Sequence, residues 1–155
     1  MILAIVGTLP YSFERLVRAV DEIAGTGFDA FIQTGNTPYA PRHCRWQSFL
    51  PRDQMLERIR DASLVISHGG FGSLADCLAH EKTVISVARR PELGETFAPQ
   101  EPLVRALAAQ GRIIAVSDVS TLAAAVVSAS QFRPASGAEN RIPQLISEFL
   151  RRSAI

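Results

Sequence analysis

The sequence predicts an α/β protein with a Rossmann-like parallel sheet flanked by helices. Short apolar runs alternate with segments whose apolar residues recur at helical spacing, which is typical of parallel strands connected by helices. The run at residues 2–6 is continuously apolar, as expected for a strand buried on both faces. A second run, at 64–66, leads into a glycine-rich turn and a further helical segment, so that residues 64–78 read LVISHGGFGSLADCL. A strand, a turn and a helix N-terminus in this order can hold a phosphate or a sugar nucleotide.

The first half of the chain reads as strand, helix, strand. Apolar residues at three- and four-residue spacing predict a helix after Ser12, a candidate cap, that ends at Gly25 or Gly27. Pro51 is suited to the first turn of the next helix. The strands expected in this half cover residues 2–6, 28–33 and 45–50.

The second half repeats the order of strand and helix. The helix after the glycine-rich turn is expected to begin at about Ser73, and an alanine-rich helix follows Asp118 or Ser120 as its cap. Another helix, from about residue 100, stops at Gly111. The strands expected here cover residues 64–67, 83–87 and 113–116. We therefore predict a nucleotide-sugar-binding domain over residues 1–130, a linker over 131–137 and a C-terminal helix within 138–155.

Composition favours an ordinary globular domain. The 155 residues, of which 47% are hydrophobic and 20% charged, are enough for one domain with a full core. The net charge of +1 gives no reason to expect nucleic acid as a partner. No run reaches the roughly 18 apolar residues of a membrane span, and the first residues lack the features of a signal peptide. Two cysteines without metal-ligand spacing, Cys44 and Cys77, favour a reduced cytosolic protein.

The loops that leave the strands at Gly7, Thr34, Ser67 and Ala88 should share one rim. Parallel strands place their carboxyl ends at one edge of the sheet, and ligands bind there near the switch in strand order. The glycine spacing in the central turn matches neither of the two common phosphate-binding motifs, so the glycines alone fit a phosphate site and a plain tight turn equally.

Polar side chains around this turn favour a binding site. Ser73 and Asp76 are three residues apart and share one face of the expected helix. Asp76 can accept hydrogen bonds from ribose hydroxyls, or complement the helix dipole. Ser73 can bind a phosphate, or be an ordinary early helix residue. His68 can reach the cleft from the end of its strand or bond a nearby backbone group, and we favour a functional role.

The other polar candidates are less distinctive. Thr8 and Ser12 can contact a phosphate or serve as turn and cap residues. Arg89 and Arg90 can offset the charge of a diphosphate, meet a partner, or simply be solvated.

Residues 68–78 resemble the H-[AG]-G-x-G-S-x-x-[DE]-x-L signature of the family 28 glycosyltransferases, in their C-terminal nucleotide-sugar domain. The likeness is strongest to small subunits of two-part UDP-sugar transferases, which make dolichol-linked glycans or bacterial exopolysaccharide. It covers most of the chain, and weaker similarities lie at residues 6–8, 33–36, 87–89, 94–95 and 100. One departure is Pro99, where members of the family often have histidine.

The resemblance implies a single C-terminal-type half of a GT-B fold. Asp76 would then hold the ribose hydroxyls, and Gln100 would contact the donor sugar. Gly7 and Thr8 would lie near the diphosphate. The substrate-binding candidates are together Gly7, Thr8, Gly70, Gly72, Ser73, Asp76, Arg89 and Gln100, and His68 is the catalytic candidate.

The function expected from this resemblance is transfer of a hexose from a UDP-sugar to a lipid-linked acceptor, in bacterial exopolysaccharide synthesis. The enzyme would be active only with a membrane-anchored, acceptor-binding partner subunit, and would lie in the cytoplasm at the inner face of the membrane. No D-x-D motif is present, so we expect no metal at the diphosphate and no cofactor besides the UDP-sugar substrate.

Two alternatives remain open. One is a nucleotide-binding or assembly module without catalysis of its own. The other is a different enzyme that uses the same half-fold, such as a sugar-nucleotide epimerase, although such enzymes need two domains. The apolar stripe of the expected helix at 141–152 can dock on a partner or pack on its own sheet.

Overall fold

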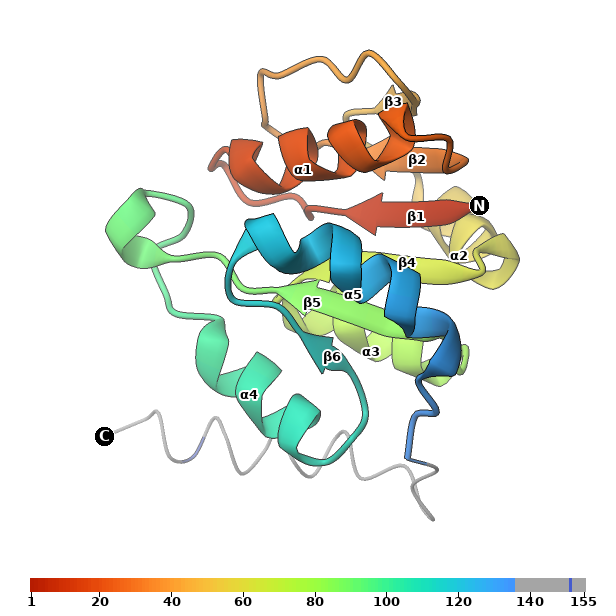
Figure 1. The fold of residues 1–155 in the computed structure, drawn as a ribbon. Coiled ribbons are helices and arrows are strands. Elements are labelled where there is room, and N and C mark those ends of the chain that lie inside the picture. Colours follow the sequence, from red (N-terminus) through yellow and green to blue (C-terminus); the bar gives the residue numbers. More distant parts are fainter. Residues whose placement is uncertain (136–150, 152–155) are drawn as a thin grey trace.

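Six parallel strands form one sheet in the order β3-β2-β1-β4-β5-β6, with helices on both faces (Figure 1). This computed structural model describes residues 1–135 and residue 151. The predicted α/β fold with a Rossmann-like parallel sheet is thereby confirmed. The strands are β1 (Ile2–Ile5), β2 (Ala30–Gln33), β3 (Arg45–Gln47), β4 (Leu64–His68), β5 (Val84–Val87) and β6 (Ile114–Ala115). The α-helices are α1 (Glu14–Gly25), α2 (Arg52–Asp61), α3 (Phe71–Ala79), α4 (Glu101–Ala109) and α5 (Leu122–Ser128).

The sheet separates two hydrophobic cores, which explains the continuous apolar run at its centre. In β1, Ile2 and Ala4 join the core beneath α1 and α5, whereas Leu3 and Ile5 join the core beneath α2, α3 and α4. Both sets are buried. A strand covered on both faces needs apolar residues at successive positions, not at alternate ones.

The direction in which the chain crosses the sheet changes between β1 and β4. The chain moves outward from β1 to β2 and β3, and then returns to the other side of β1 as β4. All neighbouring strands pair in parallel, so the loops after β1, β2, β4 and β5 leave from one edge. The loops after β1 and β4 diverge at that edge, and a site is expected between them.

Three helix starts differ from the prediction. Ser12 does not cap α1: the N-cap is Phe13, whose backbone N–H donates to Thr37 Oγ1 at 2.9 Å. The helix of the central turn begins at Phe71, two residues earlier than expected. Asp118 accepts from the backbone N–H of Ser120 and caps a short 3-10 turn, Val119–Thr121, that precedes α5.

The strand expected at 45–50 is shorter than predicted and ends at Gln47. Among the described residues, no helix combines the length and apolar character that crossing a membrane requires. A 3-10 turn, Ala129–Gln131, follows α5. Apart from Arg151, the helix expected at 141–152 lies outside the described residues, as does its apolar stripe.

Candidate functional site

A cleft of about 520 Å³ lies at the carboxyl ends of β1 and β4. Its wall includes the loop after β1, the end of β4, the first turns of α2 and α3, and the residue before α4. The chain direction changes at this point of the sheet, as expected for a ligand site. Eight of the nine predicted site residues line the cleft: Gly7, Thr8, His68, Gly70, Gly72, Ser73, Asp76 and Gln100.

His68 lines the cleft and is only 6% exposed. The backbone N–H of Gly70 donates to His68 Nδ1 at 3.1 Å, and Gln100 Nε2 lies 3.2 Å from the same nitrogen. His68 Nε2 lies 3.3 Å from Ser73 Oγ. Burial, together with the charge of Arg89, lowers the pKa of His68 to about 4, so the ring is neutral at neutral pH.

Two of the glycines make room for this ring. A Cβ at Gly70 would lie 1.9 Å from His68 Cε1, and one at Gly7 would lie 2.5 Å from His68 Nε2. Gly7 also has a positive φ of 82°, which disfavours other residues. Gly72 is different, since a Cβ there would meet no atom within 4 Å. Gly72 is therefore the glycine beside open space where a ligand can approach the backbone.

Asp76 lies on α3, in the second turn from the central loop, and is held by an arginine that sequence reasoning missed. Its Oδ2 and Oδ1 accept hydrogen bonds from Arg52 Nη1 and Nη2, both at 2.9 Å. The bond to this carboxylate raises the pKa of Arg52. A carboxylate has lone pairs for further donors, so the bidentate pair leaves capacity for hydroxyl groups. The sequence did contain a signal for Arg52: it directly follows Pro51, which marks the start of a helix.

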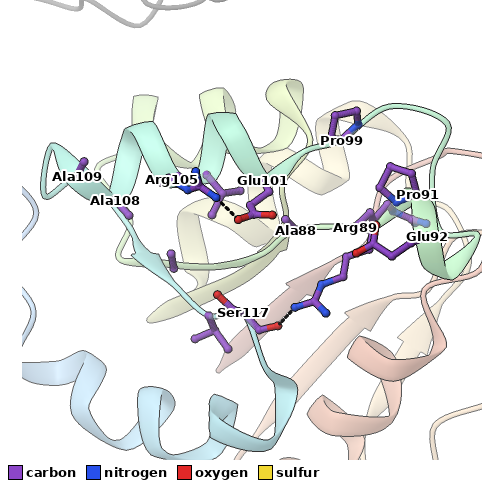
Figure 2. Close-up of a pocket in the computed structure, with 14 residues that line it drawn as sticks. Ala88, Arg89, Pro91, Glu92, Pro99, Glu101, Arg105, Ala108, Ala109 and Ser117 are labelled. Carbon is purple, nitrogen blue, oxygen red and sulfur yellow. Dashed lines mark hydrogen bonds and ion pairs between the residues drawn. The ribbon is translucent and has the colours of Figure 1, made fainter.

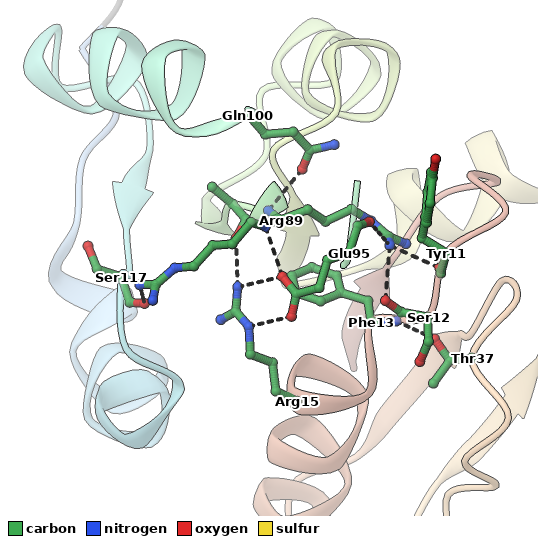
Figure 3. A network of polar contacts seen from close by, with 11 residues as sticks. Tyr11, Ser12, Phe13, Arg15, Thr37, Arg89, Glu95, Gln100 and Ser117 are labelled. Carbon is green, nitrogen blue, oxygen red and sulfur yellow. Dashed lines mark hydrogen bonds and ion pairs between the residues drawn. The ribbon is translucent and has the colours of Figure 1, made fainter. Parts of the chain in front are cut away.

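Arg89 does not line this cleft. It is 1% exposed, and its Nη2 donates to Val6 O at 2.7 Å, while Nη1 donates to Glu95 O at 2.8 Å and to Tyr11 O at 3.0 Å. Figure 3 shows the guanidinium directed toward the loop after β1. Burial lowers the pKa of Arg89 to about 10, so it keeps its charge at neutral pH. In this arrangement Arg89 joins the loops after β1 and β5, and its guanidinium does not line the cleft.

The family model for the glycosyltransferase family 28 C-terminal domain matches residues 1–149. The chain belongs to this family. The match covers nearly the whole sequence and agrees with the half of a GT-B fold that the resemblance implied. A search of curated protein sequences found no match.

Solved glycosyltransferase structures share the fold of this family 28 domain at low sequence identity. The glycotransferase of kitacinnamycin is 15% identical, with a TM-score of 0.62 over 96% of this chain and 38% of that one. MurG of Acinetobacter baumannii is 13% identical, with a TM-score of 0.54 over 81% of this chain and 40% of that one. SnogD from Streptomyces nogalater is 14% identical, with a TM-score of 0.53 over 94% of this chain and 43% of that one. The chain thus spans about two fifths of the length of each structure.

A second cavity of the family 28 domain, of about 410 Å³, lies between α4 and the ends of β5 and β6 (Figure 2). Several of its charged side chains are engaged within the protein: Arg90 Nη2 donates to Ser117 O at 2.6 Å, and Arg105 pairs with Glu101. Of the predicted site residues only Arg89 lines it. The predicted residues thus gather in the first cleft. Within the part of the chain that the structure describes, no three His, Cys, Asp or Glu side chains cluster as a metal site would need.

Proposed function

We propose that the chain is the donor-binding subunit of a two-part glycosyltransferase that moves a hexose from a UDP-sugar to a lipid-linked acceptor. The observation that carries this proposal is the cleft between β1 and β4. The chain belongs to family 28, and the N-terminus of α3, the Ser73 hydroxyl and the Asp76 carboxylate all line this cleft. These groups match the needs of a nucleoside diphosphate.

Each part of the cleft suits one part of such a ligand. The first backbone N–H groups of a helix have no partner within the helix, and the helix dipole favours an anion beside them. The N-terminus of α3, with open space at Gly72, would therefore stabilise the charge that grows on the leaving diphosphate. Asp76 lies one turn further along α3, where its carboxylate would accept hydrogen bonds from the ribose.

The acceptor site would belong to a partner subunit. The chain spans about two fifths of the glycosyltransferases that share its fold. Two apolar side chains near the cleft are exposed: Phe71, the first residue of α3, is 48% exposed, and Phe97, in the loop before α4, is 76% exposed. A membrane-anchored partner that covers this edge would bring the lipid-linked acceptor to the donor at the inner face of the membrane. We propose that the reaction serves exopolysaccharide synthesis.

A nucleotide-binding module without its own catalysis is the second candidate, and one observation favours it. The two cleft groups best suited to accept a proton are both engaged: His68 Nδ1 accepts from Gly70 N–H, and Asp76 binds Arg52. A general base for the acceptor hydroxyl would then have to come from the partner. Sugar transfer that requires both the chain and membranes of its source supports the first candidate, and UDP binding without transfer under these conditions supports the second.

The experiment for the donor site is a calorimetric titration with UDP, with NAD as the ligand control. We expect UDP to bind, NAD not to bind, and the Asp76→Ala variant to lose at least tenfold in affinity for UDP. The matched control is Asp61→Ala, which removes an exposed carboxylate from the far end of α2 and should leave affinity unchanged. UDP affinity that survives Asp76→Ala would contradict the ribose role, and a chain that does not bind UDP at all would contradict the donor site.

A further inference from the structure

The side chain of Gln100 connects the ends of β4 and β5 just before α4 begins. Its Oε1 accepts a hydrogen bond from the backbone N–H of Arg89 at 3.1 Å, and Figure 3 shows this contact. A backbone N–H can only donate, so the oxygen of the amide must face Arg89. The NH₂ group of Gln100 therefore faces His68, where Nε2 lies 3.2 Å from Nδ1. Both ends of the amide are thus used inside the protein.

The same reasoning determines the proton on His68. The backbone N–H of Gly70 donates to His68 Nδ1 at 3.1 Å, so this nitrogen is an acceptor. In a neutral imidazole, one ring nitrogen accepts and the other carries the proton. The proton of His68 is therefore on Nε2, which lies 3.3 Å from Ser73 Oγ and so at the wall of the cleft. Two backbone N–H groups, of Gly70 and Arg89, dictate this whole chain of hydrogen bonds.

Close packing keeps the ring and the amide in this arrangement. A Cβ at Gly69 would lie 2.8 Å from Gln100 Cβ, so the glycine allows the amide to approach β4. A Cβ at Gly70 or at Gly7 would likewise lie within 3 Å of the imidazole. The ring of His68 therefore packs against the backbone of the turn and of the loop after β1.

We propose that Gln100 is a positioning residue: with the Gly70 N–H, it holds His68 in the Nε2–H tautomer. His68 then presents a hydrogen-bond donor, and not a proton acceptor, to an anion in the cleft. That the anion is a nucleoside diphosphate rests on the proposed function, whereas the tautomer is a property of the free chain. The role differs from contact with the donor sugar, which the family resemblance implied for Gln100.

The test is a long-range ¹H–¹⁵N spectrum of the ¹⁵N-labelled full chain without ligand, because it reports which ring nitrogen carries the proton. We expect a protonated Nε2 and an unprotonated Nδ1 for His68. In Gln100→Glu a carboxylate faces Nδ1 and favours a proton there, so the proton affinity of His68 should rise at least tenfold. The matched control is Gln110→Glu, an identical change at the exposed far end of α4, which should leave the His68 signals unchanged.

A second variant covers the case in which Gln100→Glu does not fold. Gln100→Met keeps the volume and removes the amide donor, so His68 Nδ1 keeps only the Gly70 N–H as its donor and its ¹⁵N signal should shift. The proposal is overturned if the proton of the unmodified chain is on Nδ1. It is also overturned if His68 in a folded Gln100 variant keeps the signals and titration of the unmodified chain.

Addition of UDP to the labelled chain separates this proposal from the proposed function. If both hold, UDP shifts the His68 Nε2–H signal and leaves Nδ1 unprotonated. An Nε2–H tautomer with no response to UDP would count against the donor site and not against the role of Gln100. UDP binding by a chain whose His68 carries its proton on Nδ1 would count against Gln100 and not against the donor site.

Discussion

His68 and Arg89 lie at the carboxyl ends of the neighbouring strands β4 and β5, at the same edge of the sheet. Both side chains are buried, but their surroundings differ. The guanidinium of Arg89 donates to carbonyl oxygens of the loops after β1 and β5, and it stacks 4.8 Å from the ring centre of Phe13. The imidazole of His68 has both nitrogens within hydrogen-bonding distance of partners and forms part of the cleft wall.

The difference follows from the cost of burying charge. Burial of a cation costs less when its N–H groups are bonded, and the two terminal nitrogens of Arg89 donate to four carbonyl oxygens, while its Nε has no partner among the described residues. His68 instead stays neutral, because burial lowers its pKa to about 4. We infer that Arg89 serves the scaffold, since both its terminal nitrogens donate to carbonyl oxygens of the loops, whereas His68 lines the cleft and its Nε2 lies 3.3 Å from the Ser73 hydroxyl. Two predictions test this contrast.

The largest effect is expected from Arg89→Met. The substitution keeps an apolar stem against Phe13 but leaves the carbonyl oxygens of Val6, Tyr11 and Glu95 without their donor. A buried acceptor left without its donor typically costs about 1–3 kcal/mol, and because three are left unpaired we expect the free energy of unfolding to fall by about 3–5 kcal/mol. Urea denaturation followed by circular dichroism measures it.

Arg90→Met is the matched control, because Arg90 is less buried and its guanidinium donates to Ser117 O at a solvent-exposed position. Its free energy of unfolding should change by about 1 kcal/mol or less. If the two variants are equally stable and only Arg89→Met loses UDP affinity, then Arg89 belongs to the binding site and the contrast with His68 is wrong.

The second expected effect is the contribution of His68 to the pH dependence of the free energy of unfolding. In the unfolded chain this histidine takes up its proton near its ordinary pKa of 6.5, whereas the folded protein resists protonation down to a pKa of about 4. Between these values the unfolded state binds more protons, so the free energy of unfolding falls as the pH falls. The His68 contribution between pH 7 and pH 4 is up to about 3 kcal/mol, since each tenfold change in proton affinity is about 1.4 kcal/mol.

The comparison with His68→Gln isolates this contribution, because the carboxylates titrate in both proteins. The variant should lose less stability than the unmodified chain when both are denatured in urea at pH 7, 5.5 and 4. Parallel pH profiles for the two proteins would mean that His68 titrates normally in the folded state and is more open to water than its packing implies.

The order of strands and helices was predictable because each element carries its own apolar period, and the position of the site followed from the parallel strands. Residues 64–68 illustrate this, since a continuous apolar run before a glycine-rich turn permits few other structures. The partners of polar groups were not predictable in this way. Asp76 pairs with Arg52, 24 positions away, and Arg89 donates to residues about 80 positions earlier. Nothing in a local pattern encodes such pairs, because they depend on which loops meet at the sheet edge.

The central glycines illustrate the same limit within a single turn. Sequence reasoning treated Gly70 and Gly72 alike, as positions where the backbone approaches a ligand. In the structure Gly70 accommodates the ring of His68, and only Gly72 adjoins open space. The two glycines therefore offer a matched pair of substitutions with opposite expected signs.

Gly70→Ala should destabilise the protein by about 1–3 kcal/mol, as overpacking does, because the new methyl group would lie 1.9 Å from His68 Cε1. Gly72 lies within the first turn of α3, and a methyl group there would contact no atom within 4 Å. The better helix propensity of alanine in Gly72→Ala should therefore stabilise the protein by up to about 1 kcal/mol. Urea denaturation of both variants measures the two changes, and the UDP affinity of Gly72→Ala adds a functional test. A more stable protein that binds UDP less tightly would show that the space at Gly72 is used by the ligand. If both alanines destabilise equally, the turn requires glycine for its backbone conformation, and the imidazole of His68 is not what Gly70 accommodates.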